Sequence, residues 1–471
     1  MNNFPGQPPG FFRYLINDGC IILCYMAGVK EYISNNLSFF KGWAVYLPFL
    51  ILVLCNFLDQ YYFTYEGAAA MKSYTLSMPV YWIVVGIGTC ISAIMSSIIK
   101  KHLADGDREA MNKSASNALV YTVVFSLIVS AVVFLGVLPL VYSYTETAVG
   151  DNIFDFLSPI MALNFALALN MVMTGMLAVL GETKKYVTCL VVTLVAELTI
   201  DPFFIFFWKM GVMGNGLGTV CCLSISGILA LYWILAKKTP LRISWRLVNR
   251  SLADFHRAAK GIVSYMAHVV FQQVGELIVR MNLYLTYSLS YGIPVLYTSF
   301  VAIVGGGTAA STTPEYRRLY AENDIDGAYK LFKNSLLETF IIMVILSALL
   351  YSFDDALILF MVNHASLEES TPFVVWTLDV LCVSAPFLGL RAVCSSVFVD
   401  RNAVKKNVFD NFIFFVLRTA VLVYAIGFDF FWLIYLLTLE RFFIGVIAVY
   451  QARRYILSKK KAVPPVTADN S

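Results

Sequence analysis

The sequence predicts an all-α protein that crosses a membrane many times, and three observations support this fold class. The 471-residue chain is 59% hydrophobic and only 14% charged, with a mean hydropathy of +0.73. A soluble protein of this length carries more charge, about 25% of its residues. Apolar runs of about 18 residues or more recur along the whole chain, and such runs span a bilayer as helices. The Lys and Arg residues fall mainly in alternate loops.

The apolar runs define twelve predicted membrane spans. In order they cover residues 43–64, 76–99, 116–141, 155–180, 185–208, 211–236, 260–288, 292–313, 330–352, 370–397, 407–427 and 430–452. The earlier apolar stretch at 20–28 lies between Asp18 and Lys30 and is too short to span, so we expect an interfacial helix there.

The distribution of Lys and Arg predicts the orientation of these spans. Cytoplasmic loops carry an excess of basic residues, and with the N-terminus inside only Lys72 and Lys209 fall in outer loops. Both termini are therefore expected in the cytoplasm, with the protein in the plasma membrane. The formal net charge of +4 follows from this topology, so no nucleic-acid partner is expected. The expected partners are the lipid bilayer and a small-molecule substrate, and the protein is expected to be monomeric.

The chain divides into two similar halves. An interfacial or cytoplasmic segment (1–42) precedes an N-lobe (43–236), and a cytoplasmic linker (237–259) leads to a C-lobe (260–452) and a basic tail (453–471). At an offset of about 217 residues, Asp107 falls on Asp324 and Asn117 on Asn334. Repeated bundles joined by a cytoplasmic linker are typical of secondary transporters. Chance similarity between apolar segments is the alternative, and the constant spacing of polar residues favours a duplication.

Acidic residues inside the N-lobe spans are the main candidate site. The stretch VAELTIDPFFIF (195–206) places Glu197 and Asp201 one turn apart on one helix face, and Asp59 lies in the first span. Hydrocarbon disfavours the ionised form of each acid, so intramembrane acids are functional candidates. Pro202 frees a backbone carbonyl and can kink the helix, and Thr219 can add a hydroxyl. These oxygens suit a proton or a hard cation such as Na⁺. The alternative is protonated acids that only join neighbouring helices.

The C-lobe carries charges of both signs. Glu276 and Arg280 lie four residues apart and can neutralise each other, so a structural ion pair is as good an interpretation as a functional one. Together with Asn170 and His268 they are weak candidates for the wall of a substrate cleft. Among the remaining charges, Arg391 and Arg418 need buried partners, and Glu440 and Arg441 are expected to pair with each other.

No pattern for catalysis, a resident metal or a cofactor is evident. The nine Cys residues show no paired C-x-x-C spacing, and the four His residues lie on separate segments. Free thiols buried in the membrane are therefore expected. The only metal considered is a coupling Na⁺ at Asp59, Glu197 and Asp201. We predict a protein that is not an enzyme.

Three segments resemble the multidrug and toxic compound extrusion (MATE) family. The block GMLAVLGETKKYVTCLVVTLVAELTIDPFFIFFWKMGVMGNGLGTV (175–220) is similar to the family's pattern of G-(D/E)-T-K, N-x-x-x-D-P-x-F-I and G-V-x-G-A-A-x-A-T. LCNFLDQYYF (54–63) is similar to its N-x-x-D motif, and LADGDREA (103–110) to its inner-loop segment. Their order and spacing make the resemblance specific, and it extends over residues 43 to 450.

The resemblance implies two six-helix bundles in a V shape that alternate between outward and inward access. It implies export of amphipathic, cationic small molecules in exchange for H⁺ or Na⁺. On the matching motifs, Asp59, Asp201 and Thr219 would be coupling residues, and Glu197 stands where the family pattern has Asn. A titratable group at that position separates this chain's ion chemistry from the family's. Two alternatives remain: a flippase for a lipid-linked oligosaccharide or other lipid precursor, and a non-transporting receptor or scaffold.

Overall fold

The computed structural model describes residues 43–236, 238–248, 263–283, 285–362, 371–398, 401–427 and 429–462. This part of the chain is helical and contains no strand. The first-half helices are α3 (Trp43–Phe63), α4 (Ala68–Ala104), α5 (Arg108–Val132), α6 (Leu138–Ser143), α7 (Thr147–Ala162), α8 (Asn164–Val179), α9 (Thr183–Pro202) and α10 (Gly211–Leu235). The second-half helices are α12 (Val263–Met281), α13 (Leu285–Ala321), α14 (Ile325–Ser352), α15 (Asp354–Val362), α16 (Thr371–Ser395), α17 (Arg401–Ile426) and α18 (Phe430–Ala462).

Each of the twelve predicted spans coincides with a helix or a pair of consecutive helices. In the described residues, eight helices are long and apolar enough to cross a membrane, or nine if the bent pair α7 and α8 is one span. Helices α3, α12, α15 and α17 are not counted in this set, although Phe412–Ile426 of α17 forms a shorter apolar helix. The all-helical membrane fold is thus confirmed, and the number twelve stays a prediction.

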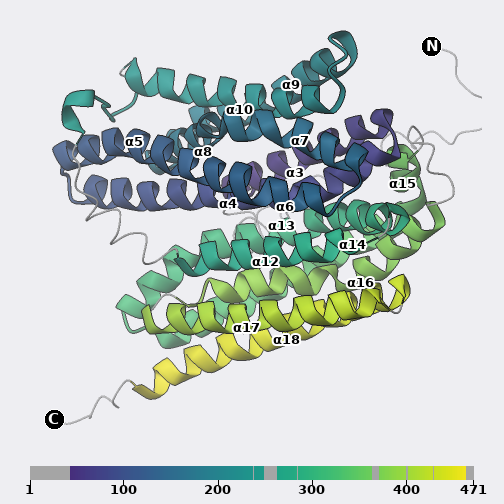
Figure 1. Cartoon of the computed structure of the whole chain (residues 1–471). Coiled ribbons are helices and arrows are strands. Elements are labelled where there is room, and N and C mark those ends of the chain that lie inside the picture. The colour runs from purple at the N-terminus through teal and green to yellow at the C-terminus, as the bar shows by residue number, and fades with distance from the viewer. Residues whose placement is uncertain are drawn as a thin grey trace, which may run out of the picture.

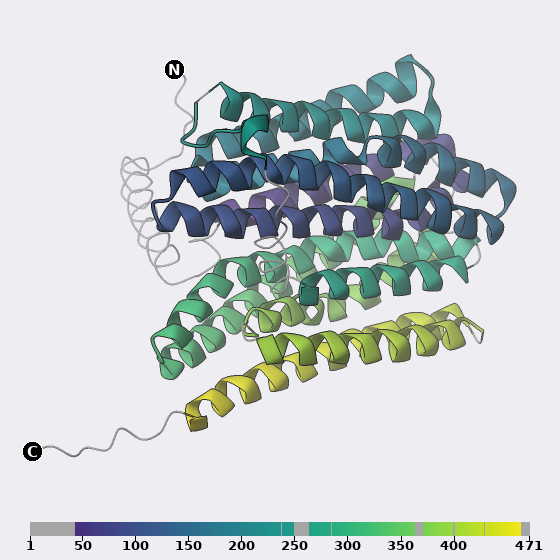
Figure 2. The same ribbon diagram turned by 60° about the vertical axis from the view of Figure 1, so that its left-hand side comes forward.

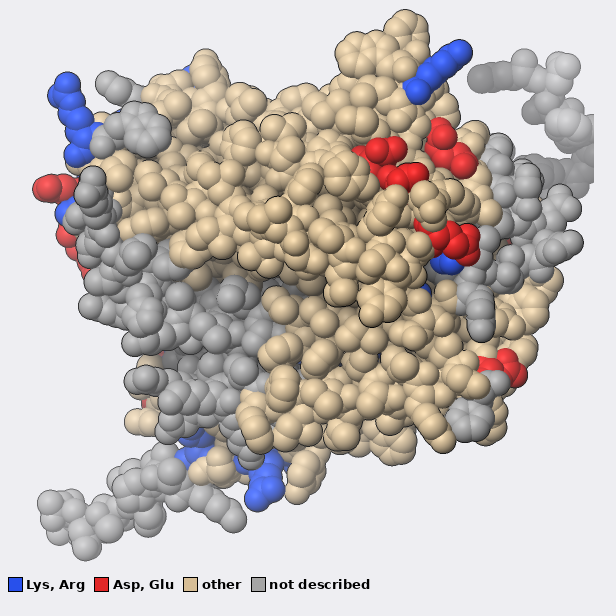
Figure 3. Space-filling model, viewed as in Figure 1, with Lys and Arg blue, Asp and Glu red and all other residues tan. Residues whose placement is uncertain are grey.

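The two halves form two lobes that lie side by side. Figures 1 and 2 show α3 to α10 on one side and α12 to α18 on the other in both views. Figure 3 shows a broad band without Lys, Arg, Asp or Glu among the described residues of the visible face, and these charged side chains gather toward its two ends. That distribution fits a body that spans a membrane, because charged groups avoid the hydrocarbon.

The internal repeat is visible in the helix boundaries. Helix α4 begins at Ala68 and α13 at Leu285, and each has 37 residues. The next helix in each half is capped by an aspartate, since Asp107 accepts a hydrogen bond from the Ala110 N–H and Asp324 accepts one from the Gly327 N–H. Such a cap stabilises a helix by about 0.5–2 kcal/mol. The matching caps and lengths support a duplication.

The lobes share one core at one end and have separate cores at the other. The shared core contains the first halves of α4 and α13 together with α7, α15 and the start of α16. Among the described residues, the second half of α4 belongs to a core of N-lobe and linker residues, and the end of α13 belongs to a core of C-lobe residues. At the shared end, α13 approaches α4 so closely at Gly292 that a Cβ there would overlap Thr75. Tyr61 of α3 stacks on Phe360 of α15 at the same end, with ring centroids 4.7 Å apart. The chain is therefore closed at the end where α3 leads into α4.

Helix α18 ends at Ala462, so it includes the first residues of the predicted basic tail. The predicted interfacial segment (1–42) and residues 249–262, which include the second half of the predicted linker, lie outside the described residues. The expected topology relative to the cytoplasm stays a prediction.

Candidate cation site in the N-lobe and its counterpart in the C-lobe

The three predicted acids of the N-lobe come together. Asp59 on α3, Glu197 and Asp201 on α9 are each at most 1% exposed, and they interact electrostatically with one another. Helix α9 contacts both α3 and α10, which places the acids between three helices. No ion pair links them to a Lys or Arg among the described residues. A buried negative group without a basic partner is costly, so it requires a proton or a cation.

Polar groups of α10 complete the site. The Thr219 hydroxyl donates to Asp59 Oδ1 at 3.4 Å, and the Asn215 amide donates to the backbone carbonyl of Asp59, also at 3.4 Å. Cys222 places its Sγ 3.9 Å from Asp201 Oδ1. Thr219 was predicted from the sequence, whereas Asn215 and Cys222 were missed. Their spacing of four and three residues from Thr219 puts them on the same helix face and was the available signal.

The backbone around Asp201 is adapted to this packing. Pro202 ends α9 and is followed by a π-helical turn, Phe203–Phe207. Such turns commonly interrupt α-helices at functional sites. On α10, a Cβ at Gly218 would overlap the Asp201 carboxyl group. Only a glycine therefore leaves room for the carboxyl against α10.

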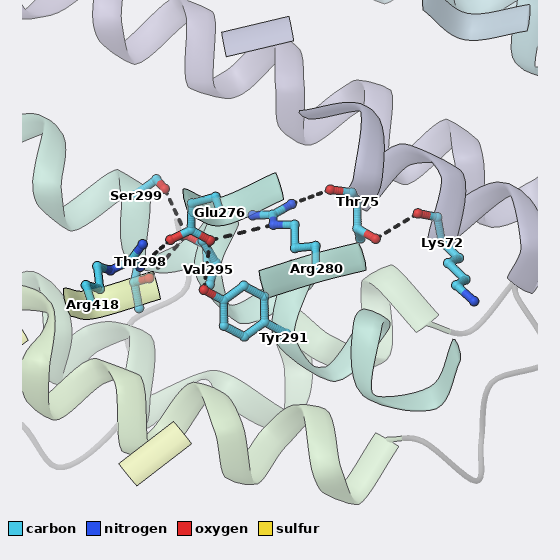
Figure 4. Close-up of polar contacts among 9 residues, drawn as sticks. All are labelled: Lys72, Thr75, Glu276, Arg280, Tyr291, Val295, Thr298, Ser299 and Arg418. Atoms are coloured by element: carbon cyan, nitrogen blue, oxygen red, sulfur yellow. Dashed lines mark hydrogen bonds and ion pairs between the residues drawn. The ribbon is translucent and has the colours of Figure 1, made fainter. Parts of the chain in front are cut away.

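The equivalent place in the C-lobe holds a neutralised network (Figure 4). Glu276 on α12 is bonded by Arg418 of α17, with Arg418 Nη2 2.6 Å from Glu276 Oε1. The Tyr291 hydroxyl donates to Glu276 Oε2 at 2.8 Å, and Arg280 Nε lies 3.7 Å from the same oxygen. Arg418 Nε is 3.2 Å from Glu440 Oε1 on α18. Both acids therefore pair with guanidinium groups, and Arg391 and the buried Arg441 add further positive charge near Glu440.

The two sites correspond through the repeat. At the offset of 217 residues Asp59 falls on Glu276 and Asp201 on Arg418. The pair of facing acids in the N-lobe is thus replaced by an acid and a base in the C-lobe, and Phe414 stands at the position equivalent to Glu197. An ion pair satisfies its own charge, so this lobe needs no added cation.

Three of the four residues predicted to line a substrate cleft are buried. Asn170 is 6% exposed and donates to the Leu223 carbonyl at 2.6 Å, so it joins α8 to α10 inside the N-lobe. Glu276 and Arg280 are also buried, at 8% and 7% exposed. Arg280 Nη1 donates across the lobe interface to the Thr75 carbonyl (Figure 4). His268 lies on α12, and its side chain is outside those that the structure describes.

The remaining C-lobe charges differ partly from expectation. The predicted Glu440–Arg441 pair is wrong among the described side chains, because Glu440 pairs with Arg418. Adjacent residues on a helix point about 100° apart, so they do not face each other. Arg391 lies over the Phe414 ring, 5.3 Å from its centroid.

The fold and site define a helical multi-pass membrane protein with two repeated lobes and a group of three buried acids in one of them. The MatE family model matches residues 45–203, which contain Asp59, Glu197 and Asp201. No curated protein matches the sequence.

Solved structures share the fold along nearly the whole chain. An inward-facing multidrug resistance MATE family transporter of the MOP superfamily matches with 16% identity and a TM-score of 0.74, covering 87% of this chain and 96% of that one. The outward-facing conformation of such a transporter matches at 16% identity and 0.70, covering 89% and 95%. A MOP superfamily transporter from Pyrococcus furiosus Vc1, described by a reversed polarity of its binding pocket, matches at 16% and 0.72, covering 89% and 95%.

The chain therefore carries a MatE family domain and has the fold of the MATE family transporters, which confirms the resemblance of its sequence.

The close packing of Gly218 provides a first prediction. Gly218→Ala should force the Asp201 carboxyl away from α10 and reduce ion-coupled transport at least about tenfold, since displacing a binding group by about 1 Å is costly. Transport by reconstituted protein measures the loss. Gly306→Ala is the matched control, because it is also a helical glycine and a Cβ there meets nothing within 4 Å. Equal transport by both variants would show that Asp201 tolerates displacement.

The C-lobe network provides a second prediction. Arg418→Met removes the ion-pair partner of Glu440 and one of the two arginine partners of Glu276. Because it leaves buried charge without a partner, it should lower the free energy of unfolding by about 3–5 kcal/mol. Thermal unfolding in detergent measures the change. Arg318→Met removes an exposed arginine that pairs with Glu315 and Glu322, and it should cost about 0–1 kcal/mol. An Arg418→Met protein as stable as the Arg318→Met protein would contradict a structural role for the network.

Proposed function

We propose that the protein is a secondary antiporter that exports amphipathic, cationic small molecules in exchange for H⁺ or Na⁺ by alternating access. The observation that supports this most strongly is the buried group of three acids in the N-lobe, without a basic partner among the described residues. An ion that binds this group neutralises its charge. If the ion binds one of the two access conformations more tightly, its binding shifts the protein toward that conformation.

The energetics are sufficient for export. Moving one charge across the membrane potential supplies about 2.3 kcal/mol per 100 mV. A proton adds about 1.4 kcal/mol for each unit of pH difference. A negative site also attracts a cationic substrate, so the substrate and the coupling ion compete for the same charge. Competition of this kind links the release of one to the uptake of the other.

Alternating access requires two arrangements of the lobes. The shared core and the contacts of Gly292 with Thr75 and of Tyr61 with Phe360 close one end of the molecule. The separate cores at the other end leave the lobes without a common apolar contact region there among the described residues. Opening the closed end requires separation of the shared core, and the similar solved structures include both inward-facing and outward-facing conformations.

A flippase for lipid-linked sugars is the alternative, and it would need free cationic groups for a diphosphate. Arg280 and Arg418 are buried and paired with Glu276, and Arg418 also pairs with Glu440. Their charge is already neutralised, which favours the antiporter. A receptor or scaffold would move neither ions nor dyes.

The test is efflux of a fluorescent organic cation from proteoliposomes under separately imposed pH and Na⁺ gradients. We expect efflux to follow one of the two gradients. Asp201→Asn should abolish this efflux, because the amide cannot carry the charge of the carboxyl. The amide keeps the size of the carboxyl, so the free energy of unfolding should stay unchanged within about 1 kcal/mol.

Asp326→Asn on α14 is the matched control, since it removes an acid outside the site. Full gradient-driven efflux by Asp201→Asn would refute the coupling assignment. Movement of a lipid diphosphate instead of the dye would favour the flippase.

A further inference from the structure

A thiol lies within the acidic site of the N-lobe. Glu197 and Asp201 of α9 and Cys222 of α10 each offer one ligand atom, two oxygens and a sulfur, and these three atoms lie within 4.8 Å of one another. The three residues are at most 1% exposed. The sulfur is the feature that separates this group from a site built of oxygens alone.

The acids of this group have open coordination positions. Neither oxygen of Glu197 has a hydrogen-bond partner among the described residues, and the same holds for Oδ2 of Asp201. Buried polar atoms are normally satisfied, and each exception calls for an explanation such as an ion. These oxygens therefore point to a bound cation as well as to an acidic environment.

The ligand types identify the class of cation. Na⁺ and Mg²⁺ prefer oxygen ligands only, whereas Zn²⁺ and its softer relative Cd²⁺ accept thiolate sulfur together with carboxylate oxygen. Zinc commonly uses three protein ligands and leaves a fourth position open. Metal–ligand lengths of about 2.0–2.3 Å require the three atoms to close in from their spread of up to 4.8 Å by a small side-chain movement.

We propose that Glu197, Asp201 and Cys222 form a binding site for a thiophilic divalent cation, Zn²⁺ or Cd²⁺. On binding, the Cys222 thiol loses its proton to the solvent and the thiolate sulfur bonds the metal, while the two carboxylates supply one oxygen each. The two carboxylates and the thiolate carry three negative charges, and the metal reduces this to one.

The inference goes beyond the proposed antiport, although the two share Glu197 and Asp201. A metal held by these acids occupies the groups that exchange H⁺ or Na⁺, so Zn²⁺ and Cd²⁺ are expected to inhibit transport. Binding itself does not require transport, and the experiment therefore measures binding. Failure of the antiport proposal would leave its result unchanged.

The test is a titration of Cd²⁺ into purified, tag-free protein in detergent, followed by calorimetry and by the ultraviolet absorption of a thiolate–Cd²⁺ bond. We expect a saturable site with one equivalent of metal and a thiolate absorption. Cys222→Ser keeps the size of the side chain but offers no thiolate, so it should remove the absorption and weaken binding at least about tenfold. Binding should also weaken as the pH falls, because protons compete for the ligands.

Cys189→Ser is the matched control. Cys189 is also a fully buried thiol on α9, two turns before Glu197, and its Sγ donates to the Ser226 carbonyl at 3.6 Å. This variant should bind Cd²⁺ like the unchanged protein. Glu197→Gln should weaken binding without loss of the thiolate absorption at saturation, which tests the site if Cys222→Ser folds poorly. Unchanged affinity in Cys222→Ser and Glu197→Gln, or an equal loss in Cys189→Ser, would overturn the proposal.

Discussion

Three carboxyl groups share a buried space between α3, α9 and α10, and their charge is the constraint on which the rest of the N-lobe depends. Asp59, Glu197 and Asp201 have no ion-pair partner among the described residues, and the oxygens of Glu197 have no hydrogen-bond partner there. Burial of such a group is favourable only with protons or a cation present. The glycine at 218 and the π-helical turn after Pro202 fit the carboxyls into this space.

The C-lobe shows the same architecture with its charge cancelled. Glu276 occupies the place of Asp59, and Arg418 replaces Asp201 and bonds Glu276 at 2.6 Å. The duplicated lobe thus keeps a polar centre that joins α12, α17 and α18, and Arg280 extends it to the N-lobe through the Thr75 carbonyl. The N-lobe thus keeps acids without a basic partner among the described residues, whereas the acids of the C-lobe network are paired with arginines. This asymmetry supports coupling through the N-lobe alone.

Much of this arrangement follows from local spacing in the sequence. Glu197 and Asp201 are one helical turn apart, the helix caps Asp107 and Asp324 repeat at a fixed offset, and each apolar run coincides with a helix or a pair of consecutive helices. Contacts between distant helices have no such signal. The pairing of Arg418 with Glu276 and Glu440 depends on how three helices pack, so the sequence left Arg418 without a partner and wrongly paired Glu440 with Arg441. Cys222 shares a helix face with Thr219, but its nearness to the acids of α9 depends on how the two helices pack.

The central claim is that substrate and coupling ion compete for the N-lobe acids, with Glu197 as a titrating member. Proton release on addition of a cationic dye to weakly buffered, detergent-solubilised protein tests this most directly, with Na⁺ absent and then present. The account predicts that the unchanged protein releases protons, or Na⁺ in their place, and that Glu197→Gln releases measurably fewer per dye bound. Dye binding that displaces neither ion, or equal release by Glu197→Gln, would contradict it.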